Sequence, residues 1–158
     1  MTDTLEVRYR DSLLGAAINA AINGAIAWFT FRAAAQVPMT LDLISTQEKS
    51  VWGQGVSLAL ALGLILTLVA WTVFSGQVAK AHPALAERVR QPLFPTVAGI
   101  ALNNTMALFG WLVVLAVLWQ RLLGTIYVAP LAAAILVGLC AGIITVLVEV
   151  RTKRALLR

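Results

Sequence analysis

Hydrophobic positions along this 158-residue chain gather into four long stretches that are separated by short polar segments. The stretches cover approximately residues 13–31, 55–74, 96–119 and 127–150. A bilayer core about 30 Å thick is crossed by about 20 helical residues, and each stretch supplies about that number. None of them has an acidic or basic side chain near its middle. The pattern predicts an all-α, polytopic membrane protein whose four transmembrane helices form one domain, an up-down bundle over residues 1–158.

The polar segments between the stretches predict the connections of the bundle. We expect an outer loop over residues 32–54, a cytoplasmic loop over residues 76–95 and a tight outer turn over residues 120–126. The outer loop is long for a helical bundle, and long loops are often functional. Within it, Met39–Ile44 alternates apolar and polar residues as a strand does, although an interfacial helical turn fits equally well. We expect this loop to dock on the bundle and to cap its outer end.

Local signals predict where individual helices begin. Ser12, which follows Asp11, is a candidate N-cap for the first helix. Pro130 is expected in the first turn of the fourth helix, where a proline is tolerated because the first amide groups have no partner within the helix. Residues 83–90 are expected to form a short helix in the cytoplasmic loop. The first stretch is too long for the apolar part of a signal peptide, so we expect it to be a retained span.

The composition agrees with a membrane location. The chain is 60% hydrophobic and 12% charged, whereas soluble domains are about 25% charged. Its net charge of +5 raises the question of nucleic-acid binding. However, almost every lysine and arginine lies at the end of an apolar stretch or in a connection, and no basic face with interleaved aromatic residues is found. The expected partner is therefore the lipid bilayer, and we expect no nucleic acid.

The distribution of basic residues predicts an orientation. Nine lie on one side of the expected bundle: Arg8, Arg10, Lys80, Arg88, Arg90, Arg151, Lys153, Arg154 and Arg158. Three lie on the other side: Arg32, Lys49 and Arg121. Short cytoplasmic segments of membrane proteins are enriched in lysine and arginine. Both termini and the loop over residues 76–95 are therefore expected in the cytoplasm.

Tryptophan and tyrosine residues support these boundaries, because their rings favour the level of the lipid headgroups. Trp111 is the exception, since it lies deeper in the third stretch. We interpret it as a residue for ordinary packing or lipid contact rather than as a platform for a ligand. The others are Trp28, Trp52, Trp119 and Tyr127 at the expected outer interface and Trp71 near the inner one.

Four asparagines are the most polar side chains within the apolar stretches. Asn19 and Asn23 are four residues apart, so they share one helix face, whereas Asn103 and Asn104 are turned about 100° from each other. An unpaired amide in hydrocarbon costs several kcal/mol. These side chains are therefore expected either to hydrogen-bond across helix interfaces or to line a solute path between the first and third spans. We favour the first alternative.

Small residues predict where helices approach closely. Gly138 and Gly142 form a GxxxG arrangement in the fourth stretch, which is typical of close helix packing or of dimerisation. Gly15 and Gly24 lie in the first stretch, and Gly99 lies in the third. We expect these glycines at helix interfaces, either within one chain or between copies.

One segment resembles a known group of proteins. The residues from Asn19 to Trp28, followed by Arg32, resemble the first span of small bacterial inner-membrane proteins with four helices and a similar length. The resemblance is limited to the first span. It implies a prokaryotic inner-membrane location and, because no activity is known for that group, nothing about a mechanism.

Residues typical of enzymes are mostly missing from the sequence. His82 is the only histidine and Cys140 the only cysteine, which argues against a haem with two histidine ligands and against thiol redox chemistry. No cluster of metal-ligating residues has a suitable spacing, so we expect no metal, no cofactor and no catalytic residue. Glu149 is the one acidic residue that touches a span, and we interpret it as part of an interfacial ion pair with Arg151 or Arg154.

These observations leave two functional hypotheses. The first is a non-catalytic membrane subunit that self-associates or joins a larger complex through the small-residue faces of the first and fourth spans. The second is a minimal oligomeric transporter or channel that passes a small neutral or weakly polar solute along the asparagines. One four-helix protomer has little room for a solute path, and this favours the first hypothesis.

Overall fold

The structure of the chain, a computed structural model, describes residues 9–42, 49–81 and 94–156. These ranges contain four long helices: α1 (Tyr9–Phe31), α2 (Val51–Ala81), α4 (Phe94–Leu123) and α5 (Pro130–Leu156). Each helix is long and apolar enough to cross a membrane. The expectation of a helical protein with four candidate transmembrane helices is therefore confirmed.

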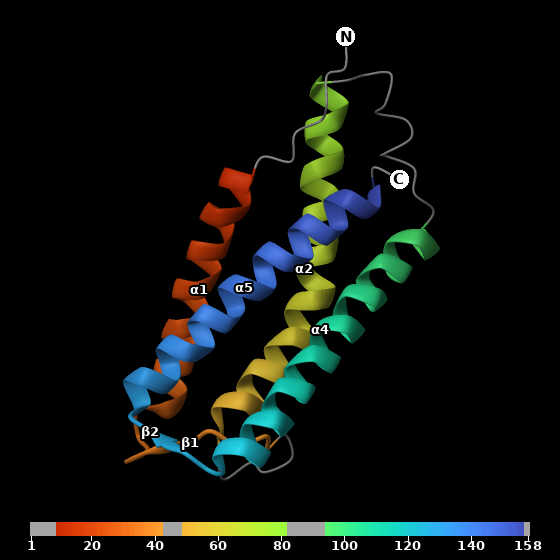
Figure 1. Cartoon of the computed structure of the whole chain (residues 1–158). Helices are drawn as coiled ribbons and strands as arrows, with labels where there is room; N and C mark the ends of the chain where they lie inside the picture. Colours follow the sequence, from red (N-terminus) through yellow and green to blue (C-terminus); the bar gives the residue numbers. More distant parts are fainter. Residues whose placement is uncertain (1–8, 43–48, 82–93, 157–158) are drawn as a thin grey trace.

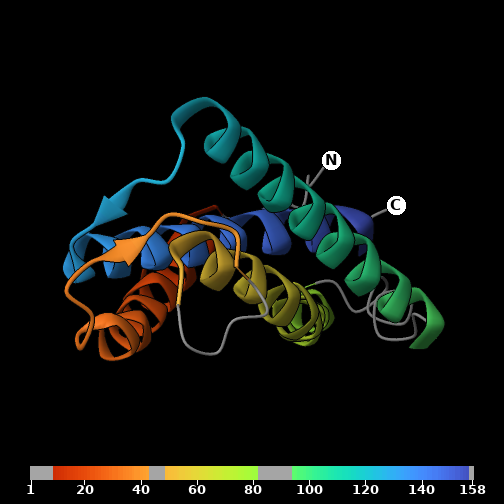
Figure 2. The same ribbon diagram turned by 90° about the horizontal axis from the view of Figure 1, so that it is seen from below.

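Helix α5 is the central element of the bundle. Successive helices alternate in direction, and α5 is inclined to α1 and α2, crossing in front of α2 (Figure 1). It packs along α1 and along α2, and α2 in turn packs along α4. The contact between α4 and α5 is small, and α4 is set away from α1 when the molecule is viewed from below (Figure 2). Accordingly, 50% of the apolar window of α5 is buried, compared with 11% for α4.

The interface between α1 and α5 depends on small residues that face each other. A Cβ atom added to Gly138 would lie 2.8 Å from the main-chain oxygen of Ala20 and 3.2 Å from the Cα atom of Gly24. One turn further along α5, a Cβ atom on Gly142 would lie 3.3 Å from the main-chain oxygen of Ala16. The two helix backbones can approach this closely only because these positions carry no side chain. The predicted GxxxG motif therefore packs within the chain.

Two short strands join the loop after α1 to the segment before α5. β1 (Val37–Pro38) pairs antiparallel with β2 (Tyr127–Val128), and the amide of Met39 donates a 2.8 Å hydrogen bond to the carbonyl oxygen of Ile126 (Figure 1). We call this end of the bundle the strand end. The opposite end, where α1 begins and α5 ends, is called the termini end.

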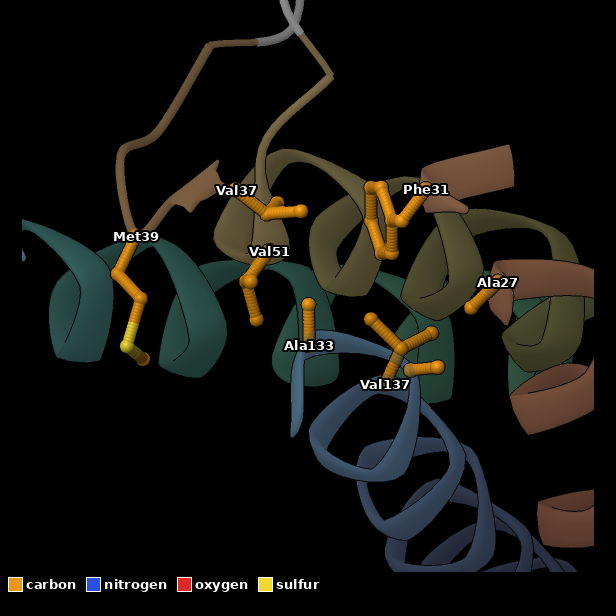
Figure 3. Packing of buried hydrophobic residues seen from close by; sticks show 8 residues of the cluster. Ala27, Phe31, Val37, Met39, Val51, Ala133 and Val137 are labelled. Atoms are coloured by element: carbon orange, nitrogen blue, oxygen red, sulfur yellow. The ribbon is translucent and has the colours of Figure 1, made fainter. Parts of the chain in front are cut away.

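The loop after α1 docks on the bundle through an apolar cluster at the strand end. Val37 and Met39 are buried against Phe31, Val51 and Val137, which come from three helices (Figure 3). The expected docking is confirmed for the described part of this loop, residues 32–42 and 49–50. The strand, however, lies just before the predicted segment Met39–Ile44, whose last two residues lie outside the described residues.

Two predicted boundaries at the strand end are wrong. The fourth helix begins at Pro130 rather than at Tyr127, because Tyr127 is paired with β1. The third helix, α4, continues into the turn that was predicted over residues 120–126. Its last helical residue is Leu123, and Gly124 follows directly. Gly124 has a φ of +70° and its amide donates to the carbonyl oxygen of Gln120 at 3.1 Å, as is typical of a glycine that terminates a helix.

The N-cap prediction for the first helix is also wrong. Ser12 lies inside α1 with its side chain fully buried. Ser50 instead caps α2, because its Oγ atom accepts a 3.1 Å hydrogen bond from the amide of Gly53. α2 and α4 both extend beyond the predicted stretches of residues 55–74 and 96–119. The short helix predicted over residues 83–90 lies outside the described residues.

The close approach of α1 and α5 predicts that Gly138→Ala destabilises the fold. The added methyl group overlaps main-chain atoms of α1, and such overpacking typically costs about 1–3 kcal/mol. Gly76→Ala on α2 is the matched control, because no atom of the described residues lies within 4 Å of the position of its Cβ atom. In a helix this control should leave the free energy of unfolding unchanged or raise it by up to about 1 kcal/mol. Denaturant titration in mixed micelles measures both variants, and equal stabilities would contradict the proposed packing.

Candidate functional site

The polar side chains within the helices gather in interfaces that involve α5. Asn19 of α1 donates a 2.6 Å hydrogen bond from Nδ2 to the Oγ1 atom of Thr145. Asn23, one turn further along α1, donates to both the side-chain oxygen of Asn19 at 2.8 Å and its main-chain oxygen at 2.9 Å. The hydroxyl group of Thr145 in turn donates a 2.8 Å hydrogen bond to the carbonyl oxygen of Ala141. The four residues form one continuous chain of hydrogen bonds between α1 and α5.

A second polar contact joins three helices. Asn104 of α4 is 3% exposed, and its Nδ2 atom donates 3.1 Å hydrogen bonds to Thr67 Oγ1 on α2 and to Thr152 Oγ1 on α5. Thr67 donates in turn to the carbonyl oxygen of Gly63 at 2.7 Å. Because α4 and α5 have little other contact, this amide is the main polar connection between α4 and the rest of the bundle.

Asn103 has a different environment from its neighbour. Its side chain is exposed, and its Oδ1 atom accepts a 3.1 Å hydrogen bond from a guanidinium nitrogen of Arg151. The sequence prediction that Asn103 and Asn104 lie on different faces is therefore confirmed. Only Asn104 lies within a helix interface.

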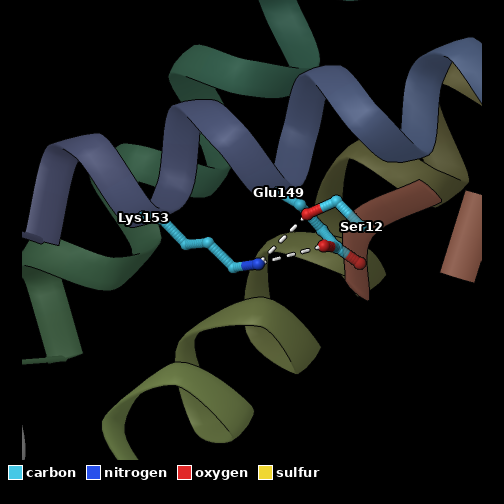
Figure 4. A network of polar contacts seen from close by, with 3 residues as sticks. All are labelled: Ser12, Glu149 and Lys153. Atoms are coloured by element: carbon cyan, nitrogen blue, oxygen red, sulfur yellow. Dashed lines mark hydrogen bonds and ion pairs between the residues drawn. The ribbon is translucent and has the colours of Figure 1, made fainter. Parts of the chain in front are cut away.

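An ionic cluster joins α1 and α5 near the termini end. Lys153 is 9% exposed, and its ammonium group donates to Ser12 Oγ at 3.1 Å and pairs with Glu149 Oε2 at 3.3 Å (Figure 4). Gly15 provides the space for the carboxylate, since a Cβ atom there would lie 3.2 Å from Glu149 Oε1. An ion pair of Glu149 is present as expected, and the partner that the structure shows is Lys153, which the sequence analysis did not name.

The predicted glycines divide into two groups. Gly15, Gly24, Gly138 and Gly142 all lie in the interface between α1 and α5. Gly99 does not, because no atom of the described residues lies within 4 Å of the position of its Cβ atom. Gly63 packs against Thr105 and lets α2 approach α4, a contact that the sequence analysis did not predict.

The sequence analysis also missed the residues that accept hydrogen bonds from the asparagines. These residues are threonines, which are common in transmembrane helices and carry no signal individually. The spacing of Thr145 and Thr152 could have identified these two. They are seven residues apart, so they lie on the same face of α5, two helical turns from each other. Lys153 was counted only as a flanking charge, and its burial could not be expected from position alone.

An apolar groove separates α4 from α5 on the side away from α1. It has a volume of about 550 Å³ and extends from Trp52 and Trp119 at the strand end to Leu147. The rings of Trp52 and Trp119 are 6.0 Å apart between centroids and inclined at 58°. The Nε1 atoms of both are buried and have no hydrogen-bond acceptor among the described residues. Trp111 also lines the groove and is 68% exposed.

This arrangement fits structural contacts better than a solute path. The proposed path between the first and third spans requires Asn19 and Asn104 to face one space, but Asn19 bonds to α5 and Asn104 to α2 and α5 in a separate interface. The donors of Asn19, Asn23 and Asn104 are directed at oxygen atoms of the protein. Comparison with protein-family models, curated proteins and solved structures finds no match.

A double-mutant cycle tests the three-helix contact. We expect Asn104→Ala and Thr152→Val to be coupled by about 0.6 kcal/mol, and at most about 1.7 kcal/mol, which is the range for such bonds in membrane proteins. The free energy of unfolding in mixed micelles gives the coupling. Asn103→Ala is the control and should show no coupling to Thr152→Val, because the two residues are not hydrogen-bonded. Coupling of equal size in the two cycles would refute the assignment.

The ionic cluster predicts that Lys153→Met lowers the free energy of unfolding by about 1–3 kcal/mol, because it leaves Ser12 and Glu149 without their charged partner. The double variant Lys153→Met with Glu149→Leu should recover most of this loss, since replacing both members of a buried pair is often neutral. Thermal unfolding in detergent compares the two. A double variant that is less stable than Lys153→Met would be inconsistent with the pair.

Proposed function

We propose that this chain is a non-catalytic integral membrane protein that acts as an oligomeric or accessory subunit of a membrane assembly. The observation that carries the proposal is an unoccupied face of α4. No atom of the described residues lies within 4 Å of a Cβ atom built on Gly99 or Gly110, although a glycine inside a helix costs about 1 kcal/mol relative to alanine. Packing within the chain does not account for these glycines, whereas close approach of a helix from another chain does.

The position of Asn103 supports the same face. Residues 99, 103 and 110 are spaced by four and seven, so they lie on one side of α4. The side chain of Asn103 is exposed there, and an amide facing lipid is unfavourable unless it finds a polar partner. Its oxygen is bonded to Arg151, and its amide nitrogen is a donor that a neighbouring helix can use. We therefore place the association surface on α4.

This placement revises the hypothesis drawn from the sequence. The small-residue faces of the first and fourth spans were expected to bind a partner. Gly24 and Gly138 instead face each other across the interface between α1 and α5. The proposed function is unchanged, but we now assign the association surface to α4 instead of to the first and fourth spans.

The transporter hypothesis has less support. It requires polar groups that are free to contact a solute, whereas the amide donors of Asn19, Asn23 and Asn104 are used within the chain. Association of several chains could create a path between protomers, and such a path would be lined by α4. Solute flux through liposomes that contain the purified protein distinguishes the two functions.

We also propose that the protein lies in a bacterial inner membrane with both termini in the cytoplasm. The support is the distribution of lysine and arginine, nine on the side of the termini against three on the other. Lys153 is one of the nine and is buried in an ion pair, so its contribution to the bias is smaller. The strand end is then the outer end.

Substitution of the open glycines tests the association surface. Gly99→Leu and Gly110→Leu should reduce the mass of the assembly, because the added side chains prevent close approach of a second helix. The fold of the chain should be retained, since both positions are open. Mass measurement of the detergent-solubilised complex, with circular dichroism for folding, gives the result. Gly76→Leu on α2 is the matched control, because its Cβ position is equally open. An assembly whose mass is unchanged in both α4 variants would overturn the proposal.

A further inference from the structure

The outward side of α4 carries a regular pattern that includes both open glycines. Its positions follow one another at alternating spacings of four and three residues, which is the heptad spacing of two helices that cross at about 20°. None of these residues is buried, and the buried residues of α4 lie on the opposite side of the helix. We call them the α4 seam: Gly99, Asn103, Met106, Gly110, Val113, Val117 and Gln120.

The amide of Asn103 indicates what kind of partner the α4 seam fits. Of the four asparagines, Asn103 is the exposed one. Its Oδ1 atom accepts a hydrogen bond from Arg151, and its Nδ2 atom has no acceptor among the described residues. A side-chain amide has two donor hydrogens and an oxygen with two lone pairs. Asn103 therefore keeps both donors and one lone pair for a partner, and in lipid such groups are costly if they find none.

We propose that the partner is a second copy of this chain, bound through the α4 seam with the two α4 helices parallel. This inference rests on the proposed association function and names its partner. Copies of a membrane protein share one orientation across the bilayer, so a two-fold axis normal to the membrane places each seam residue opposite the same residue of the other copy. Each Asn103 then donates from Nδ2 to the unused lone pair of Asn103 in the second copy.

The depth of Asn103 favours a second copy over lipid or an unrelated helix. The candidate span of α4 begins at Pro95, so Asn103 lies eight residues, or about 12 Å, inside it. Lipid tails offer no hydrogen-bond acceptor at that depth, and an unrelated helix would need a polar side chain at the same level. A second copy supplies one by symmetry. Gly99 and Gly110 lie on either side of Asn103 and let the two backbones approach closely. A single asparagine in such a seam also fixes the register of the two helices.

Disulfide cross-linking in membranes tests the identity and the orientation of the partner. Cys140, the only cysteine, is first replaced by alanine, so that each variant carries one thiol. Met106→Cys places this thiol in the α4 seam, where the proposed axis brings the thiols of two copies within the distance that a disulfide spans. Leu118→Cys is the matched control, because Leu118 is 50% exposed and Met106 54%, but Leu118 lies on another face of α4. Mild oxidation should yield a covalent dimer of Met106→Cys and roughly tenfold less of the control.

The outcomes separate this inference from the function on which it rests. A smaller assembly in Gly99→Leu, together with no cross-link in Met106→Cys, would retain the association surface but overturn the second copy as its partner. Equal cross-linking of Met106→Cys and Leu118→Cys would overturn the α4 seam as the contact between copies. A covalent dimer confined to Met106→Cys supports the inference, because an antiparallel or unrelated partner cannot place residue 106 opposite itself.

The equilibrium between monomer and dimer tests the amide pair. Energy transfer between donor- and acceptor-labelled copies, measured as the detergent is diluted into the sample, gives the dissociation constant. Asn103→Ala removes both hydrogen bonds between the copies and should raise this constant roughly eightfold, as expected for two such bonds in a membrane. Arg151→Gln is the control, because it breaks the same contact within the chain but leaves the α4 seam intact, and the constant should stay within about twofold. Equal constants for the two variants would refute the amide pair.

Discussion

The close approach of α1 and α5 is the contact on which the rest of the bundle depends. Between helices in lipid there is no hydrophobic driving force, so association relies on van der Waals packing and on hydrogen bonds. Gly24 and Gly138 allow the two backbones to meet, and this proximity brings Asn19 within 2.6 Å of Thr145 and Lys153 within 3.1 Å of Ser12. The polar contacts follow from the packing, because none of these side chains could reach its partner across a wider interface.

The same helix organises the other half of the molecule in a different way. Its second face packs on α2. α2 in turn packs against α4, where Gly63 contacts Thr105. α4 reaches α5 through the hydrogen bonds of Asn103 and Asn104 and through an apolar cluster that contains Leu108, Ile144 and Val148, and a groove opens between the two helices beside this cluster. On one side of the bundle α1 and α5 pack closely against each other. On the other side, the face of α4 that lines the groove and the face that carries Gly99 and Gly110 remain available to lipid or to another subunit.

The number and approximate extent of the helices could be predicted from hydropathy, because a span must be long and apolar whatever it packs against. The partners of each side chain could not. In a soluble helix the apolar stripe marks the buried face, but in lipid both faces are apolar, so nothing in the sequence shows that Thr145 faces α1 while Gly99 faces outward. Asn19, Asn23 and Asn104 were recognisable as interface residues because an exposed amide is costly in lipid, but the same argument does not distinguish them from Asn103, whose side chain is exposed. The pairing of Val37 with Val128 joins residues 91 positions apart (128 − 37) and had no local signal.

The uneven burial of the helices also means that local stability is uneven. Segments with few buried apolar contacts open at lower free energy than the core, and they do so as cooperative units. Three contacts along their length join α1 and α5. They are the pairing of β1 with β2, the hydrogen bond of Asn19 to Thr145 and the hydrogen bond of Lys153 to Ser12. α4, with 11% of its apolar window buried, is joined to the bundle among the described residues by the buried hydrogen bonds of Asn104 and the exposed one between Asn103 and Arg151. Its main-chain amides should therefore exchange with deuterium before those of α5, and the order of unfolding would begin with the helix that is most available to partners.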